Sequence, residues 1–125
     1  MLLSISFEND IPIYVQIYRQ IVIGIASKRL QPNESLPSIR SLASDIGINL
    51  HTVNKAYTML KENGYIVIDR RIGAAVAAKS PPVENVVNKL DTNLQTIAAE
   101  AMCHGMDKIH FLELCKKVFD QLEGE

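Results

Sequence analysis

The sequence has no long apolar run and very little cysteine, and both shortages narrow the class of protein that it represents. Its longest apolar runs, such as residues 21–26, are far shorter than the roughly 20 residues that span a bilayer. The N-terminus also lacks the basic-then-apolar pattern of a secretory signal. The two cysteines, Cys103 and Cys115, are too few for a disulfide framework in 125 residues, so we expect buried, reduced thiols. These absences predict a soluble, cytoplasmic protein without a membrane partner.

The motifs of common enzyme classes are missing as well. The chain contains no G-x-S-x-G, no phosphate-binding loop and no H-E-x-x-H. A chain of 125 residues with 47% hydrophobic content can bury one modest core and a small extra element, which disfavours a large enzyme fold. The two cysteines and two histidines within residues 103–115 follow no common zinc spacing, and Cys115 belongs to an apolar face. We therefore expect no catalysis, no metal and no cofactor.

Positive and negative charges nearly balance overall, but they are unevenly placed along the chain. The formal net charge is −1, yet residues 1–80 hold nine Lys or Arg against six Asp or Glu, whereas residues 81–125 hold four against eight. A polyanion is therefore attracted to the first part of the chain only, and the bias gains meaning only with a motif behind it.

The first part of the chain carries the periodicity of three helices. Isoleucines recur every fourth residue from Ile13 to Ile25, and Asp10 with Pro12 forms a start signal, which predicts a helix over residues 11–29.

Two shorter amphipathic helices follow. Residues 39–46 have apolar side chains at i, i+3, i+4 and i+7, and Gly47 ends this helix. Asn49 can cap the next helix, which runs until Gly64. So short a connection makes the two helices cross sharply, as in a helix-turn-helix.

A β-hairpin and a boundary come next. "YIVID", "RRIG" and "AAVAA" at residues 65–78 predict two short strands whose tip carries two arginines, and they are apolar enough to close the underside of the three helices. The adjacent prolines in "KSPPV" stop both strand and helix, which predicts two domains, residues 1–80 and 81–125. The predicted fold class is mostly α with a small β-hairpin.

Beyond the boundary, two apolar stripes indicate a helical dimerisation element. The first has alternating steps of four and three, typical of a coiled-coil-like seam, and is too apolar to face water on a lone helix. We expect self-association through this seam, Val83, Val87, Leu90, Leu94, Ile97 and Ala101, and through a stripe on the last helix, Phe111, Leu114, Val118 and Leu122.

Polar side chains of the first part gather where a nucleic acid could meet them. The exposed side of the third helix holds hydrogen-bonding residues near a helix N-terminus, which suits a DNA major groove and its phosphates: Asn49, His51, Thr52, Asn54 and Lys55. Arg40 projects from the preceding helix, and Arg70 with Arg71 lies at the hairpin tip. Periodicity alone leaves an ordinary three-helix core open, whereas the joint order of helix, helix-turn-helix and hairpin favours DNA binding.

These stretches resemble the GntR family of bacterial transcription regulators. The resemblance is carried by "PIYVQI" at 12–17, "LQPNESLPSIRSLASDIGINLHTVNKAY" at 30–57 and "LKENGYI" at 60–66, and it covers about residues 10–78. It implies a winged helix-turn-helix domain. Only about 45 residues remain, patterned as two helices, which resembles the short YtrA-type branch whose appendage serves dimerisation.

The resemblance also implies roles for single residues. It implies that Arg40 contacts DNA, that Asn49 begins the recognition helix and that residues 70–73 form the wing. Leu50 stands where many members have an arginine, and the wing lacks a second glycine and an aromatic. The predicted DNA-binding residues are Ser38, Arg40, Asn49, His51, Thr52, Asn54, Lys55, Arg70, Arg71 and Gly73.

The sequence thus predicts a homodimeric repressor that binds a palindromic operator in double-stranded DNA. The alternative is a winged helix used only for protein contact. Neither the operator nor a small-molecule effector can be named from these residues.

Overall fold

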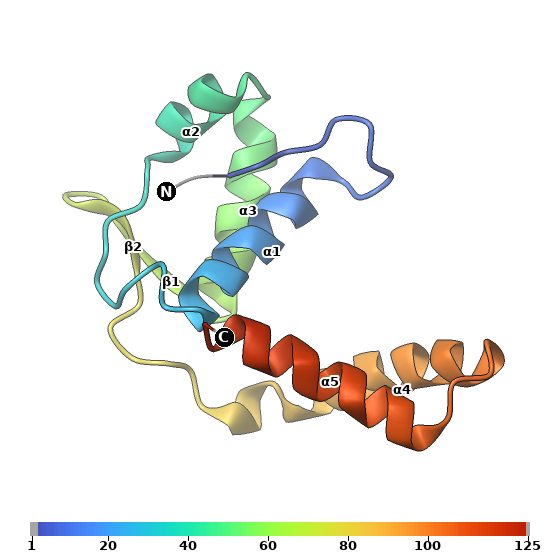
Figure 1. The fold of residues 1–125 in the computed structure, drawn as a ribbon. Helices are drawn as coiled ribbons and strands as arrows, with labels where there is room; N and C mark the ends of the chain where they lie inside the picture. Colours follow the sequence, from blue (N-terminus) through green and yellow to red (C-terminus); the bar gives the residue numbers. More distant parts are fainter. Residues whose placement is uncertain (1–2, 125) are drawn as a thin grey trace. The chain divides into compact units, whose positions relative to one another are not determined.

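The computed structural model describes residues 3–124, which form five α-helices, one 3-10 helix and one β-hairpin (Figure 1). The predicted fold class, mostly α with a small hairpin, is confirmed. The chain divides into two compact units, an N-terminal unit that ends at Ser80 and a C-terminal unit that begins at Pro81. The elements are α1 (Ile13–Ala26), α2 (Ile39–Ile46), α3 (Leu50–Glu62), β1 (Ile66–Asp69), β2 (Gly73–Val76), η1 (Val83–Asn85), α4 (Val87–Cys103) and α5 (Lys108–Leu122).

The core of the N-terminal unit lies where α1 and α2 pack against α3 (Figure 1). The hairpin contributes Ile66, Ala74 and Val76 to this core, so its inner face closes the helical layer. Burial of these apolar side chains supplies the main favourable term in folding. The side chains with no exposed surface at the centre are Ile17 and Ile21 of α1 and Val53, Ala56, Tyr57 and Leu60 of α3.

Helix α1 is shorter at both ends than the predicted span of 11–29. Pro12 has extended backbone angles and serves as the N-cap without a side-chain hydrogen bond, so the helix begins only at Ile13. At the other end Lys28 adopts a positive φ of 65°, which no α-helical residue has, and the helix has already ended at Ala26. Asp10 therefore does not cap α1.

The helix-turn-helix follows the predicted local signals. Gly47 has a φ of 81°, in the left-handed region that favours glycine, and ends α2. The Asn49 side chain accepts a hydrogen bond from the His51 N–H at 2.7 Å and caps α3. The whole connection between α2 and α3 consists of Gly47, Ile48 and Asn49.

The loop before α2 pairs with β2 through an isolated antiparallel bridge, Ser35 opposite Ala75, which the sequence did not predict. The N–H of Leu36 donates to the carbonyl of Ala74 at 2.9 Å, and the N–H of Val76 donates to the carbonyl of Glu34 at 2.8 Å. The strands β1 and β2 themselves pair antiparallel, with Ile66 opposite Val76. The base of the hairpin is therefore fixed on both sides of β2.

Two glutamines of α1 hold the segment that precedes it. Gln16, the one buried polar residue among those described, accepts from the Ser6 N–H at 2.8 Å and donates to the Ser6 carbonyl at 2.9 Å and to the Ile11 carbonyl at 2.8 Å. One turn later, Gln20 makes the same pair of bonds with the backbone of Ser4. Amide side chains thus replace a strand partner for this extended segment.

A buried tyrosine ties α3 to the entrance of α2. The Tyr57 hydroxyl donates a hydrogen bond to the Pro37 carbonyl at 2.8 Å, directly before Ser38, the N-cap of α2. Burial disfavours the phenolate and raises the pKa of Tyr57 to about 12.

We expect Tyr57→Phe to lower the free energy of unfolding by about 1–2 kcal/mol, because the Pro37 carbonyl loses its partner. The difference between the two proteins should also shrink at high pH. The unfolded tyrosine ionises near 10 and the folded one near 12, so stability is full below the first value and is lost as the pH rises through the second. Urea unfolding of both proteins at neutral pH and in this alkaline window measures the effect, and a difference that stays constant with pH contradicts it.

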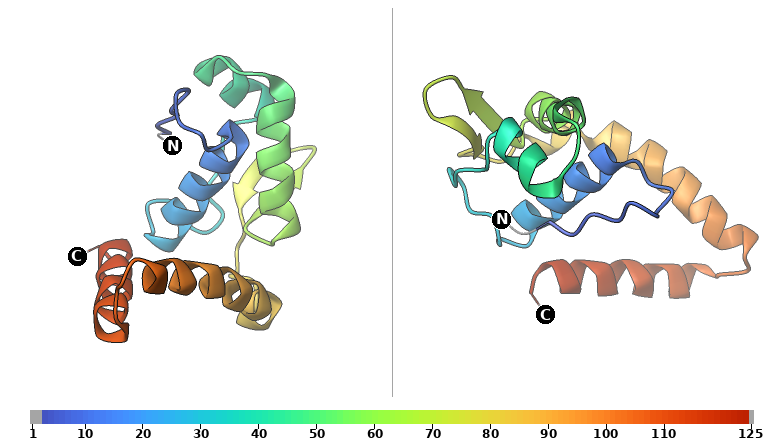
Figure 2. Two further views of the ribbon diagram at one scale, coloured as in Figure 1. Left: turned by 90° about the vertical axis from the view of Figure 1, so that its right-hand side faces the viewer. Right: turned by 90° about the horizontal axis from the view of Figure 1, so that it is seen from above.

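The C-terminal unit contains no buried residue among those described. Its helices α4 and α5 diverge from the turn at residues 104–107 as a V (Figure 2). The seam was predicted to start at Val83, but Val83 lies on η1, because Val86, with a φ of −125°, interrupts the helix before α4. The expectation of buried cysteines is wrong as well: Cys103 is exposed and Cys115 is half-buried, both as free thiols.

The last helix begins at a well-formed cap. The Asp107 carboxylate accepts a hydrogen bond from the His110 N–H at 3.0 Å and also contacts the His110 ring. The backbone N–H of His110 lowers the pKa of Asp107 first, and its ring adds to the effect. The cap therefore strengthens α5 at neutral pH, and this contribution falls away in acid as the carboxylate is protonated.

Candidate nucleic-acid interface

The start of α3 carries half of the predicted DNA-binding residues. His51, Asn54 and Lys55 are exposed, and Thr52 is half-buried. Leu50, the first residue of the helix, leaves 39% of its surface exposed, so an apolar group stands among these polar ones. A helix with donors and one apolar side chain near its N-terminus can offer base edges both hydrogen bonds and contact with a thymine methyl group.

Ser38 and Asn49 have structural partners in addition to any DNA. The Ser38 hydroxyl accepts from the Ser41 N–H at 3.0 Å, as the Asn49 amide does from His51. Both side chains therefore fix the starts of α2 and α3, the two helices that form the motif. Their contact with DNA remains a prediction.

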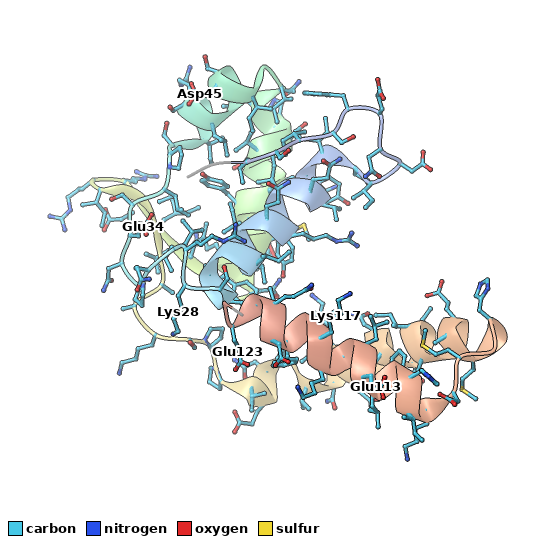
Figure 3. All side chains as sticks on the ribbon, viewed as in Figure 1. Lys28, Glu34, Asp45, Glu113, Lys117 and Glu123 are labelled. Atoms are coloured by element: carbon cyan, nitrogen blue, oxygen red, sulfur yellow. The ribbon has the colours of Figure 1, made fainter. Side chains whose placement is uncertain are left out.

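Arg40 is the predicted DNA contact on α2. It is exposed, and no hydrogen bond or ion pair restrains it among residues 3–124. Asp45, the acidic residue of the same helix, lies near the C-terminal end of α2 and projects outward (Figure 3). A guanidinium without an internal carboxylate keeps its donors available for a phosphate or a guanine.

The hairpin tip carries the other two arginines. Arg70 and Arg71 are exposed in the turn between β1 and β2, and the tip projects from the helices on the side away from α1 (Figures 1 and 2). Asp69 accepts a hydrogen bond from the Arg71 N–H at 2.7 Å, which fixes the turn, while Gly73 supplies a φ of 81°. Arg71 Nε and Asp69 Oδ1 lie 3.9 Å apart, and the arginine side chain is 89% exposed, so this pair leaves the charge largely free.

The cations of this surface are therefore not neutralised from within. Arg71 with Asp69 forms the one ion pair found in the described part of the N-terminal unit. The structure thus brings the residues predicted on α2, α3 and the hairpin into one unit with open donors. What it does not test is their contact with DNA.

One contact at this surface was not predicted from the sequence. Lys55 Nζ lies 4.0 Å from the centroid of the Tyr14 ring. Tyr14 and Lys55 lie far apart in the sequence, and no local signal pairs a tyrosine of the first helix with a lysine of the third. The packing of α1 against α3 creates the contact.

Residues 3–124 contain neither a metal-binding cluster nor a membrane-spanning helix. No group of three or more His, Cys, Asp or Glu is placed to hold a metal ion within that range. None of its helices combines the length and the apolar character that crossing a membrane requires.

Sequence comparison identifies the relatives of this chain. The model of the gntR family of bacterial regulatory proteins matches residues 13–76. The transcriptional repressor YtrA of Bacillus subtilis is 29% identical over 125 residues, which cover 98% of this chain and 96% of that protein.

Solved structures agree with this grouping. A transcriptional antiterminator from Listeria monocytogenes has a TM-score of 0.88 at 26% identity and covers 100% of this chain and 95% of its own. YtrA from Sulfolobus acidocaldarius, a GntR-family transcription factor, has a TM-score of 0.59 at 34% identity, with 95% and 97% covered. The DNA-binding domain of AraR, solved in complex with operator ORR3, has a TM-score of 0.51 at 25% identity, with 62% and 93% covered. The chain belongs to the gntR family of bacterial transcription regulators.

Proposed function

We propose that this regulator is a homodimeric repressor that binds a two-fold symmetric operator through α3, Arg40 and the wing. One observation carries the proposal. Hydrogen-bonding side chains at the start of α3 lie in the same unit as exposed arginines, and the carboxylates of that unit leave the charge of these arginines largely unpaired. Such a helix fits the major groove of B-DNA, and a basic hairpin tip can follow the adjacent backbone or minor groove. The chromosome of a bacterium lies in the cytoplasm, and we place the protein there.

Dimerisation is supported by apolar surface that one chain leaves uncovered. On α4 the seam residues Val87, Leu90, Leu94 and Ile97 are each 47–51% exposed. On α5, Leu114 and Val118 of the predicted stripe are 45% and 46% exposed, and Phe119 beside them is 69% exposed. A second copy that packs into the open V would bury both surfaces.

A two-fold symmetric dimer would suit a two-fold symmetric operator. A two-fold axis would bring two copies of α3 to successive major grooves, about 34 Å apart for half-sites one helical turn apart. Repression is supported by the name of the Bacillus relative, which is similar over nearly its whole length. The negative balance of residues 81–125 suits a segment that stays away from phosphates.

The test is a nuclease footprint of the full-length protein on the DNA upstream of its own gene, together with a transcription reporter from that region. We expect a protected sequence with two-fold symmetry and higher reporter output when the protein is removed. Equal affinity for upstream and random DNA would contradict specific binding. If the protein shows no salt-dependent DNA binding at all and is not retained on heparin, a module for protein contact is the better assignment.

The wing should contribute affinity without specificity. Replacement of Arg70 and Arg71 by Ala is expected to weaken operator and random DNA alike. It should also flatten the plot of log K against log salt by roughly 0.9 for each phosphate that the protein no longer neutralises. The matched control is the double replacement of Lys28 and Arg29 by Ala. Lys28 lies at the end of the N-terminal unit opposite Asp45 of α2, and α2 is the helix that carries Arg40 (Figure 3). Weakening confined to operator DNA would mean that the wing reads sequence.

A further inference from the structure

The ammonium group of Lys55 on α3 lies over the aromatic ring of Tyr14 on α1. Lys55 Nζ lies 4.0 Å from the centroid of the Tyr14 ring, and Tyr14 belongs to the first turn of α1. Lys55 is exposed and forms no ion pair among residues 3–124. The Tyr14 ring is therefore the one partner of the Lys55 ammonium group found among residues 3–124.

The Tyr14 ring packs against the core of the N-terminal unit. Tyr14 is half-buried and lies one turn before Ile17 and two turns before Ile21, which are both fully buried. The negative face of an aromatic ring attracts a cation at this distance. A ring covers one side of an ammonium group, so the remaining donors of Lys55 face solvent, where a phosphate could approach.

We infer that Tyr14 is a positioning residue for DNA binding, which holds Lys55 in place at the start of the recognition helix to meet a backbone phosphate. The inference rests on the proposed binding of DNA by α3. An unrestrained lysine must be immobilised when it pairs with a phosphate, at a cost of about two- to tenfold in affinity for each side chain. A lysine that is already held over a ring avoids part of that cost.

Four variants of the full-length protein test the inference: Tyr14→Phe, Tyr14→Leu, Lys55→Met and the Tyr14→Leu/Lys55→Met double variant. Binding is measured as a function of salt on a duplex of random sequence, where phosphate contacts dominate. Lys55→Met should reduce the salt slope by about 0.9 for each bound protomer. Tyr14→Leu should weaken binding about two- to fivefold for each protomer, whereas Tyr14→Phe, which keeps the ring, should stay within about twofold of the wild type.

The double variant separates positioning from general packing. If Tyr14 acts through Lys55, Tyr14→Leu will have no further effect once Lys55 is Met. Tyr18→Leu is the matched control: Tyr18 lies one turn later on α1, accepts a hydrogen bond from Asn63 and stacks edge-on with Tyr65, away from Lys55. Tyr18→Leu removes an aromatic ring from the same helix and should leave both the affinity for the random duplex and the salt slope unchanged.

The inference is overturned by additive effects in the double variant, by equal weakening in Tyr14→Phe and Tyr14→Leu, or by tighter binding by Tyr14→Leu. Wild-type binding that Lys55→Met leaves unchanged would also refute it while the proposed function stands. Failure of the wild-type protein to bind any DNA would instead contradict the proposed function itself.

Discussion

A chain that ends at Ser80 will remain folded but will lose specific operator binding, with affinity reduced by on the order of 10² to 10⁴. The N-terminal unit has its own core, to which all three of its helices and the hairpin contribute, so removal of the C-terminal unit leaves that core complete. What the truncated chain loses is the link between two weak half-site interactions, which makes the second binding event intramolecular. Analytical ultracentrifugation and operator titration of both chains measure the two effects.

A substitution within the full-length chain gives the sharper form of this experiment. Leu94 is 48% exposed on the seam, whereas Thr96 lies on the polar side of the same helix. Leu94→Asp should therefore produce a monomer with weak binding, and Thr96→Asp, which adds the same charge to α4, should remain a dimer with normal binding. A full-length protein that is monomeric at micromolar concentration, or a truncated chain that keeps operator affinity, would refute the role assigned to the C-terminal unit.

Arg40→Ala will abolish specific binding while the fold is retained. Removal of one bidentate base contact or charged phosphate contact costs about 1–3 kcal/mol for each half-site, so a dimer should bind on the order of 10²-fold more weakly, or worse. Because Arg40 is exposed and makes no internal bond among the described residues, stability should change by no more than about 0.5 kcal/mol.

Gel-shift titration with circular dichroism measures both quantities, and Arg29→Ala provides the control for removal of one positive charge. Arg40→Lys adds a distinction. A lysine can replace a point-charge contact with phosphate, but it cannot reproduce the fork of a guanidinium on guanine. Unchanged affinity in Arg40→Ala would remove this residue from the interface.

The sequence predicted best those features that local chemistry decides. Gly47 and Asn49 mark the connection between α2 and α3 because a left-handed glycine and a side-chain cap act within a few residues. The contacts that were missed join distant segments: Leu36 with Ala74, and Lys55 with Tyr14. Helix periodicity contains no information about which loop will bond to a hairpin or which ring will contact a lysine.

The errors in the C-terminal unit have a related cause. A repeat of apolar residues predicts which side of a helix is buried, but it does not say what covers that side. Val83 continues the repeat and yet lies on η1, and Cys115 shares an apolar face that one chain leaves partly open. The predicted DNA contacts are a similar case, because the apolar periodicity of a chain does not identify the molecule that its exposed polar side chains bind.

The pairing of the loop before α2 with β2 sets an order for events during synthesis. The chain leaves the ribosome N-terminus first, so α1, α2 and α3 emerge before the strand on which Glu34 and Leu36 depend. A nascent chain that has reached only Asn63 still lacks Ile66, Ala74 and Val76, and its helices cannot yet enclose their core. The seam on α4 is made later still. The proposed association of two nascent chains through α4 would therefore follow only after each chain has made all the residues of its N-terminal unit.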